Sequence, residues 1–271
     1  MTQASATPPA RRDRLRTATM EEITATARRL LVEQGPEAAS LRAIAREMGM
    51  TAPGLYRYYS SREELVRHVV ADMFRELSND IRRAIAAAVP SSGPASDITA
   101  GIENAHAADE DPAERRAHGA LKMIAACREF RRWALGHRDE YGLLFGVPLP
   151  GLDDGRFDIA DQCALEFAGT FYTLFLELWN RVGFPVPSDE EIDPEMRAQL
   201  ARFRDKLGLG TDLPVGAHLI FLRCWVLLYG AVSMEVFGHL GFALTDAAPI
   251  FELTLRDLAR LVGLEYPFPN A

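Results

Sequence analysis

The chain has few cysteines, and their placement gives no sign of pairing. Cys127, Cys163 and Cys224 are odd in number, far apart and set among apolar residues. A disulfide framework or a zinc site needs cysteines or histidines at close, regular spacing, which this sequence lacks. We therefore expect three buried free thiols and no bound metal.

Uninterrupted apolar runs are also missing. A helix that spans a bilayer needs about 20 apolar residues, whereas the two most apolar stretches, 167–180 and 221–240, contain Glu177, Arg223 and Glu235. We interpret both stretches as buried or interfacial helices and expect no membrane partner. The N-terminal MTQASATPPARRDRLR lacks the apolar centre of a signal peptide, so a cytoplasmic protein is expected.

Two further absences limit the fold class and the chemistry. No segment alternates apolar and polar residues between hairpin turns, so the sequence predicts an all-α protein. The polar clusters at 137–140 and 189–195 lack a partnered nucleophile, a glycine-rich phosphate loop and metal-ligand spacing. We therefore predict no enzyme activity and no cofactor, with a small-molecule-processing enzyme as an alternative.

Charge is distributed unevenly along the chain, whose net charge is −8. Residues 1–62 hold ten arginines and six acidic residues, a net charge of +4, and the remainder carries −12. A basic segment on an otherwise acidic protein favours a local contact with nucleic acid, because the acidic part disfavours non-specific wrapping.

The most informative stretch is residues 40–62, SLRAIAREMGMTAPGLYRYYSSR, which predicts two short helices joined by a tight turn. Ser40 is placed to cap the first helix, and Gly49 to end it in the left-handed conformation that glycine tolerates. Thr51 is placed to cap the second helix, whose first turn accepts Pro53. A short helix that begins with small residues fits a DNA major groove.

With ITATARRLLVEQGPEAASL before it and SREELVRHVV after it, this stretch resembles the DNA-binding domain of the TetR family of transcriptional regulators. The residues that carry the resemblance are Ile23, Ala27, Leu30, Gly35, Ser40, Ile44, Ala45, Gly49, Leu55, Tyr56, Tyr59, Arg62 and Leu65. By position, it implies DNA contacts from Arg42, Thr51, Ala52, Gly54, Tyr56, Tyr58 and Arg62. We add Arg57 as a candidate for a guanine edge or a phosphate, and expect Tyr59 to be a core wedge.

Apolar periodicity and chain breaks predict the organisation. Residues 1–15 form a disordered basic arm, which either follows the DNA or only solubilises the protein. Residues 16–62 form a three-helix helix-turn-helix domain, and residues 63–271 form a helical ligand-binding and dimerisation domain. Helices are predicted at 17–34, 41–48, 52–58, 62–89, 97–108, 113–136, 137–146, 157–183, within 188–212, and at 214–240 and 246–262.

The C-terminal part is similar to ligand-binding domains of one branch of the family, through RRWALGHRDEYGLLFG and WVLLYGAVSMEVFGHL. That branch often has Trp-x-x-x-His-Gly where this chain has a tyrosine, so no role is carried over to a histidine there. The similarity implies an unknown small hydrophobic effector, held in an apolar cavity. The candidates to line it, each of which could instead pack in the core, are Trp133, Tyr141, Phe145, Phe167, Phe171, Tyr172, Phe175, Trp179, Trp225 and Tyr229. Charged residues in the same apolar helices, such as Arg128, Arg131 and Glu235, form internal ion pairs or anchor the ligand.

One recognition helix covers about 3 or 4 base pairs, so useful specificity requires a two-fold dimer on a palindromic operator. Family likeness implies a homodimer through residues 214–240 and 246–262, with core packing as the competing interpretation. The contact candidates are Met234, Val236, Phe237, Leu240, Leu253, Leu255 and Leu258. The resulting hypothesis is a repressor that the effector releases from double-stranded DNA by moving the 62–89 helix. An activator and a helical adaptor that does not bind DNA are alternatives.

Overall fold

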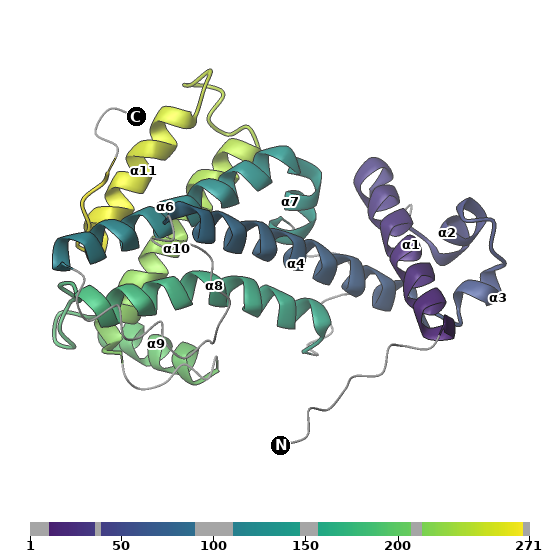
Figure 1. Cartoon of the computed structure of the whole chain (residues 1–271), viewed down its shortest axis with the longest axis horizontal. Coiled ribbons are helices and arrows are strands. Elements are labelled where there is room, and N and C mark those ends of the chain that lie inside the picture. The colour runs from purple at the N-terminus through teal and green to yellow at the C-terminus, as the bar shows by residue number, and fades with distance from the viewer. Residues whose placement is uncertain (1–10, 36–38, 90–110, 147–156, 207–212, 268–271) are drawn as a thin grey trace, which may run out of the picture. The chain divides into compact units, whose positions relative to one another are not determined.

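The computed structural model describes residues 11–35, 39–89, 111–146, 157–206 and 213–267, which form helices and turns without a strand (Figure 1). The predicted all-α class is therefore confirmed. The helices are α1 (Arg11–Gln34), α2 (Leu41–Glu47), α3 (Ala52–Leu55), α4 (Arg62–Ala88), α6 (Pro112–Gly136), α7 (Arg138–Phe145), α8 (Ile159–Val182), α9 (Pro194–Lys206), α10 (Val215–Val236) and α11 (Ala248–Leu261). The predicted helix at 97–108 and the first ten residues of the predicted arm lie outside the described residues.

The chain packs as two compact units. The first contains residues 1–76 and 139–166, and the second contains residues 77–138 and 167–271. Packing therefore places the first half of α4, and α7, with the N-terminal helices, whereas the predicted boundary at residue 62 separated them. Within the first unit, Phe74 of α4 packs edge-to-face on Phe145 of α7, with ring centroids 5.6 Å apart. Because α4 and α8 each cross the division, both helices belong to both units.

The first unit is built around the apolar faces of α1, α2 and α4. Ile23, Ala27, Ile44, Leu55 and Leu65 are all buried. Their spacing on each helix places them on one side, as the periodicity predicted.

Two predicted boundaries in this unit were wrong. Helix α1 begins at Arg11 rather than near residue 17, because arginine and leucine favour helix and no proline follows Pro9 in this segment. The predicted arm therefore includes residues that are helical. Helix α3 ends at Leu55 rather than residue 58; residues 56–58 form a turn, in which the Tyr58 amide donates to the Leu55 carbonyl at 2.9 Å.

The second unit buries its core between α6, α8, α10 and α11. Phe175 and Leu178 of α8 pack in one cluster with Ala217 and Ile220 of α10 and with Val262 just after α11. By length and composition alone, α10 is the one helix of the described part that could cross a membrane. A single such helix is weak support for a membrane protein, because the core helix of a water-soluble protein has the same properties.

Candidate nucleic-acid interface and ligand cavity

Local capping fixes the α2–α3 corner of the first unit. The Ser40 hydroxyl accepts from the Ala43 amide at 3.2 Å, and the Thr51 hydroxyl accepts from the Gly54 amide at 3.2 Å. Gly49 has φ +64°, and the next amide, that of Met50, donates back to the Ala45 carbonyl at 2.8 Å. This 6→1 bond closes the end of α2 as a Schellman motif. The predicted caps and the predicted left-handed glycine are confirmed.

The structure divides the eight predicted DNA contacts between the surface and the interior. Arg42, Thr51, Tyr56 and Arg57 are exposed, and Tyr56 keeps 51% of its surface. Ala52, Tyr58 and Arg62 are half-buried and still reach the surface.

Gly54, also among the predicted contacts, is buried. A Cβ at this position would lie 3.1 Å from the Thr51 hydroxyl oxygen. The absence of a side chain therefore keeps the cap of α3 intact, a requirement inside the protein rather than close approach to a base.

Arg16 of α1 lies beside the turn that follows α3. Its guanidinium sits 5.1 Å from the centre of the Tyr58 ring and donates to the Arg57 carbonyl at 3.4 Å. Arg11, Arg12 and Arg16 line a shallow cleft together with Arg57 and Tyr58. The sequence left open whether these N-terminal arginines follow the DNA or only solubilise the protein, and none of them was among the predicted site residues. The sequence feature that points to a basic surface here is the group of four arginines between residues 11 and 16.

The start of α4 is capped by its own side chains. The Ser60 amide and hydroxyl donate to the Glu64 carboxylate at 2.7 and 2.6 Å, and the Glu64 amide donates to the Ser61 hydroxyl at 3.1 Å. The Ser60 hydrogen bond is the main cause that holds the pKa of Glu64 below its usual value. Arg62 is therefore the first residue of a firmly capped helix.

Tyr59 is buried against His68, with ring centroids 5.2 Å apart, and burial raises the pKa of its phenol to about 12. The predicted core wedge is confirmed. Tyr59 anchors the turn from inside while Tyr56 and Tyr58 face outward.

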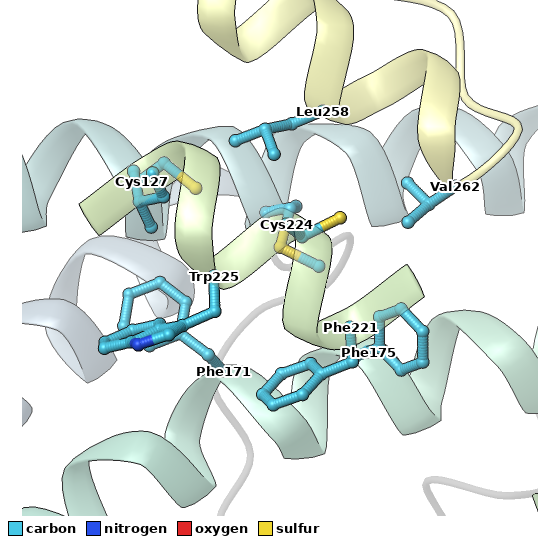
Figure 2. Close-up of a pocket in the computed structure, with 10 residues that line it drawn as sticks. Cys127, Phe171, Phe175, Phe221, Cys224, Trp225, Leu258 and Val262 are labelled. Carbon is cyan, nitrogen blue, oxygen red and sulfur yellow. The ribbon is translucent and has the colours of Figure 1, made fainter. Parts of the chain in front are cut away.

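The second unit contains a small apolar cavity between α6, α8, α10 and α11. Measured for the centre of a water-sized sphere, its volume is about 30 Å³, which is room for about one or two waters. It is lined by Met123, Cys127, Phe171, Phe175, Phe221, Cys224, Trp225, Leu228, Leu258 and Val262. Figure 2 shows the aromatic rings on one side of Cys224 and Leu258 and Val262 on the other.

No lining residue carries a charge, and the only polar side-chain atoms among them are two thiols and one indole nitrogen. Burial raises the pKa of the Cys224 thiol to about 12 and that of Cys127 still further above its usual value. Both cysteines are free and neutral, so they act as apolar wall rather than as nucleophiles.

Three of the ten predicted ligand-binding aromatics, Phe171, Phe175 and Trp225, line this cavity. Tyr229 stacks on Trp225, and Phe167 packs edge-to-face on it. Trp133 is buried elsewhere on α6, stacked on His137 at 4.8 Å.

The remaining predicted aromatics have other neighbours. Tyr141 and Phe145 pack on each other in the first unit, and Trp179 packs on Phe184. Sequence reasoning missed Phe221, which lines the cavity and packs on Tyr172 at 5.1 Å.

Tyr172 forms a buried polar pair with His218. Because a carbonyl only accepts, His218 must donate from Nδ1 to the Pro214 carbonyl, at 3.2 Å. Its Nε2 is then the acceptor for the Tyr172 hydroxyl, at 3.3 Å. Burial lowers the pKa of His218 and raises the pKa of Tyr172, so both groups are held neutral.

The charged residues of α6 are used internally. Arg131 donates two hydrogen bonds of 2.6 Å to Glu235 of α10, and Arg128 donates bonds of 3.0 and 2.8 Å to Glu252 of α11. Of the two interpretations that the sequence left open, the geometry supports internal ion pairs at these positions.

The outer faces of α10 and α11 expose apolar side chains. An apolar groove runs between the two helices, past Val226, Leu227, Met234 and Ile250. The large exposed side chains are Val226, Leu227 and Met234 of α10, Ile250 and Leu253 of α11, and Phe237, Phe242 and Leu244 of the segment that joins the two helices. Three predicted dimer contacts, Val236, Leu255 and Leu258, are instead buried inside the chain itself.

Comparison with known proteins agrees with both halves of this description. The family described as "Bacterial regulatory proteins, tetR family" matches residues 23–69, and "Tetracyclin repressor-like, C-terminal domain" matches residues 123–258. The HTH-type transcriptional regulators Rv1816 of Mycobacterium tuberculosis and Mb1846 of Mycobacterium bovis are each 28% identical over 243 residues, which is 89% of this chain and 91% of theirs.

A crystal structure of SCO4313, described as a regulatory protein, superposes with a TM-score of 0.63 at 26% identity. The match covers 93% of this chain and 98% of that one. With its capped helix-turn-helix and a C-terminal domain match that spans half of its length, the chain belongs to the TetR family of DNA-binding transcriptional regulators.

Proposed function

We propose that this regulator is a homodimeric repressor that binds a palindromic operator and is released by a small hydrophobic effector. It acts in the cytoplasm and does no enzyme chemistry. The observation that carries the proposal is the surface formed by the exposed Arg57 and the half-buried Tyr58 after α3, which Arg16 of α1 extends along a cleft. Aromatic hydroxyls and guanidinium groups on one surface suit a phosphate backbone next to a major groove.

Each DNA contact has a distinct role. Arg57 reaches a guanine edge, because it is exposed directly after the groove-facing helix. Tyr56 and Tyr58 donate their hydroxyls to phosphates, and Arg42, Arg16 and Arg62 balance the phosphate charge. Thr51 and the first amides of α3 approach a phosphate as a helix N-terminus does, and Ala52 contacts a thymine methyl.

The apolar faces of α10 and α11 are the proposed dimer interface. Monomers seldom expose so many large apolar side chains on neighbouring helices, and such patches mark protein interfaces. A two-fold axis there would pair the groove past Leu227 and Met234 with its own copy.

The cavity is the proposed effector site, in a closed form. Drug-sized ligands need roughly 300 Å³ or more, so side chains must move before a ligand enters. Helix α8 connects this site to the DNA-binding unit, because it carries Phe171 and Phe175 and continues back to Ile159. Just before it, Asp158 forms an ion pair with Arg67 of α4 at 2.5 Å. Movement of α8 would therefore pull on α4, the helix that the sequence analysis identified as the moving part.

The test is DNA binding by the full-length protein. We expect tight, salt-dependent binding to the duplex upstream of its own coding region, and at least 100-fold weaker binding to a scrambled duplex of equal composition. Fluorescence anisotropy gives both affinities, and sedimentation of the complex gives two chains per operator. Equal affinity for both duplexes would overturn the proposal.

A further inference from the structure

A second hollow, distinct in its chemistry from the apolar cavity, lies between α6 and α8. Among its lining residues are Arg115, His118 and Lys122 of α6 and Glu177 and Arg181 of α8. The apolar cavity lies between the same two helices, on Met123 and Cys127 of α6 and on Phe171 and Phe175 of α8. The pair of helices is therefore lined by a basic hollow at one end and by an apolar cavity at the other.

The basic end has more positive charge than its own carboxylate balances. Lys122 and Arg181 share a single oxygen of Glu177, with nitrogen–oxygen distances of 2.8 and 3.2 Å. Within the described part of the chain Arg115 forms no ion pair, and its Nε is buried there without a hydrogen-bond partner. Among the described lining residues, three cations thus face one carboxylate, and the Arg115 guanidinium is not paired with it. A buried donor of this kind is costly unless an anion accepts from it.

The two ends are spaced alike on both helices. Along α6, twelve residues separate Arg115 from Cys127, which is about 18 Å; along α8, ten residues separate Arg181 from Phe171, about 15 Å. The basic residues precede the apolar ones on α6 and follow them on α8, so the two helices run antiparallel. The distance from the basic end to the apolar end is therefore similar along both helices. Gly119 and Leu178 both line the basic hollow, where a Cβ on Gly119 would come within 3.0 Å of Leu178.

We propose that the effector is an amphiphilic anion, with a carboxylate or phosphate head at Arg115, Lys122 and Arg181 and an apolar tail in the cavity. This rests on the proposed function, in which the cavity holds the effector, and names the ligand's chemical class. The cavity has no charged side chain, so a charged ligand can place only its tail there. The side chains of Lys122 and Arg181 are partly exposed, which suits a head that stays near water.

The tail has to open its own space, and the chain provides a flexible residue for this. Met123 lines the cavity directly after Lys122, and methionine changes rotamer at low cost. Displacing Met123 and Leu178 joins the two spaces into one channel. The tail then separates α6 from α8, the helix that leads back to the DNA-binding unit.

The ligand test is calorimetric titration of the full-length protein with dodecanoate, dodecyl phosphate, dodecan-1-ol and acetate, below micelle concentrations. We expect at least tenfold tighter binding of one or both dodecyl anions than of dodecan-1-ol, and none of acetate. The tighter anion identifies the head. Affinity should rise several-fold per added methylene from octanoate to dodecanoate, as tail burial requires. Equal binding of the alcohol and the anions, or no dependence on chain length, would overturn the proposal.

The variant test compares Arg115→Gln with Arg116→Gln, its exposed neighbour. We expect the first to weaken binding of the anion about tenfold or more while binding of dodecan-1-ol stays within about twofold, and the second to change neither. Equal losses in both variants would overturn the assignment of Arg115. The affinity of the ligand-free protein for the operator is measured in parallel. If the wild-type protein does not bind the operator, the proposed function is wrong. If it binds the operator but does not prefer anions as ligands, only this inference is wrong.

Discussion

The turn after α3, which is proposed to contact DNA, and α10, which is proposed to form the dimer interface, use their residues in opposite ways. From Thr51 to Tyr59, neighbouring positions do different things: Thr51 caps, Leu55 and Tyr59 are buried, and Tyr56 and Arg57 are exposed. Helix α10 is apolar on nearly every face. The role of each of its residues therefore depends on what packs against that face more than on the residue type. A substitution in the turn should therefore act on binding alone. A substitution in α10 should act on assembly or stability.

This contrast also appears in the polar contacts. The first unit caps its short helices with hydroxyls at the surface, whereas the second holds α6 to α10 and α11 through Arg131–Glu235 and Arg128–Glu252. These pairs lie on the helix that lines both the cavity and the basic hollow. They hold α6 to the two helices of the proposed dimer interface.

The largest expected effect comes from a charge on the exposed face of α10. Leu227 keeps 40% of its surface, and so does Leu165 of α8, which makes Leu165→Glu a matched control. Leu227→Glu would bury one carboxylate per chain in a symmetric interface, and we expect the dimer dissociation constant to rise about 100-fold or more. Sedimentation equilibrium measures this. Dissociation of the Leu165→Glu dimer with Leu227→Glu unaffected would move the interface elsewhere.

The second effect tests the turn. Removal of the Arg57 side chain should weaken operator binding by about 1–3 kcal/mol without changing thermal stability, because this side chain is exposed. Arg83→Ala, which removes another exposed arginine, in the second half of α4, should leave affinity unchanged. Anisotropy titrations at two salt concentrations also show whether Arg57 reads a base or a phosphate, since only a phosphate contact reduces the salt slope. A large loss of stability in Arg57→Ala would break the contrast between the regions.

A smaller effect is expected at the half-buried ion pair of Arg131 and Glu235. Glu235→Gln should destabilise the protein by about 2 kcal/mol, because two charge-assisted hydrogen bonds of 2.6 Å lose the carboxylate. Asp257→Asn, which breaks the exposed Arg260–Asp257 pair of α11, should cost less than about 1 kcal/mol. Urea unfolding at fixed protein concentration compares them. Equal losses would mean that the burial of the pair has no energetic weight.

The two regions also differ in how far sequence alone predicts them. Ser40, Gly49 and Thr51 act on backbone groups within five residues, so their spacing was enough to predict caps and a turn. Whether Trp133 or Phe221 lines the cavity depends on packing against residues that are distant in the sequence. Nothing in the sequence distinguishes a core aromatic from one that borders a cavity.

For the same reason, the sequence predicted some dimer contacts wrongly and did not predict the basic hollow. Leu255 and Leu253 are two residues apart on α11, yet one is buried and the other exposed. Their difference comes from how α11 meets α10. Arg115 and Arg181 are separated by 66 positions in the sequence, and only the antiparallel packing of α6 and α8 brings them to one hollow.

The smallest effect is a pH dependence centred on His218. Burial lowers the pKa of His218 below its ordinary value of 6.5, so the folded protein holds the ring neutral more strongly than the unfolded chain does. A depressed folded-state pKa means that this stability is complete above pH 6.5 and is lost as the pH falls through the folded value. We expect wild type to lose more stability between pH 7 and pH 5 than His218→Leu does, in urea unfolding at each pH. His239→Gln, which removes an exposed histidine near the end of α10, should follow wild type. If the unfolding free energies of wild type and His218→Leu change with pH in parallel, the Tyr172–His218 pair opens before His218 is protonated. This part of the second unit would then be less tightly packed than its burial indicates.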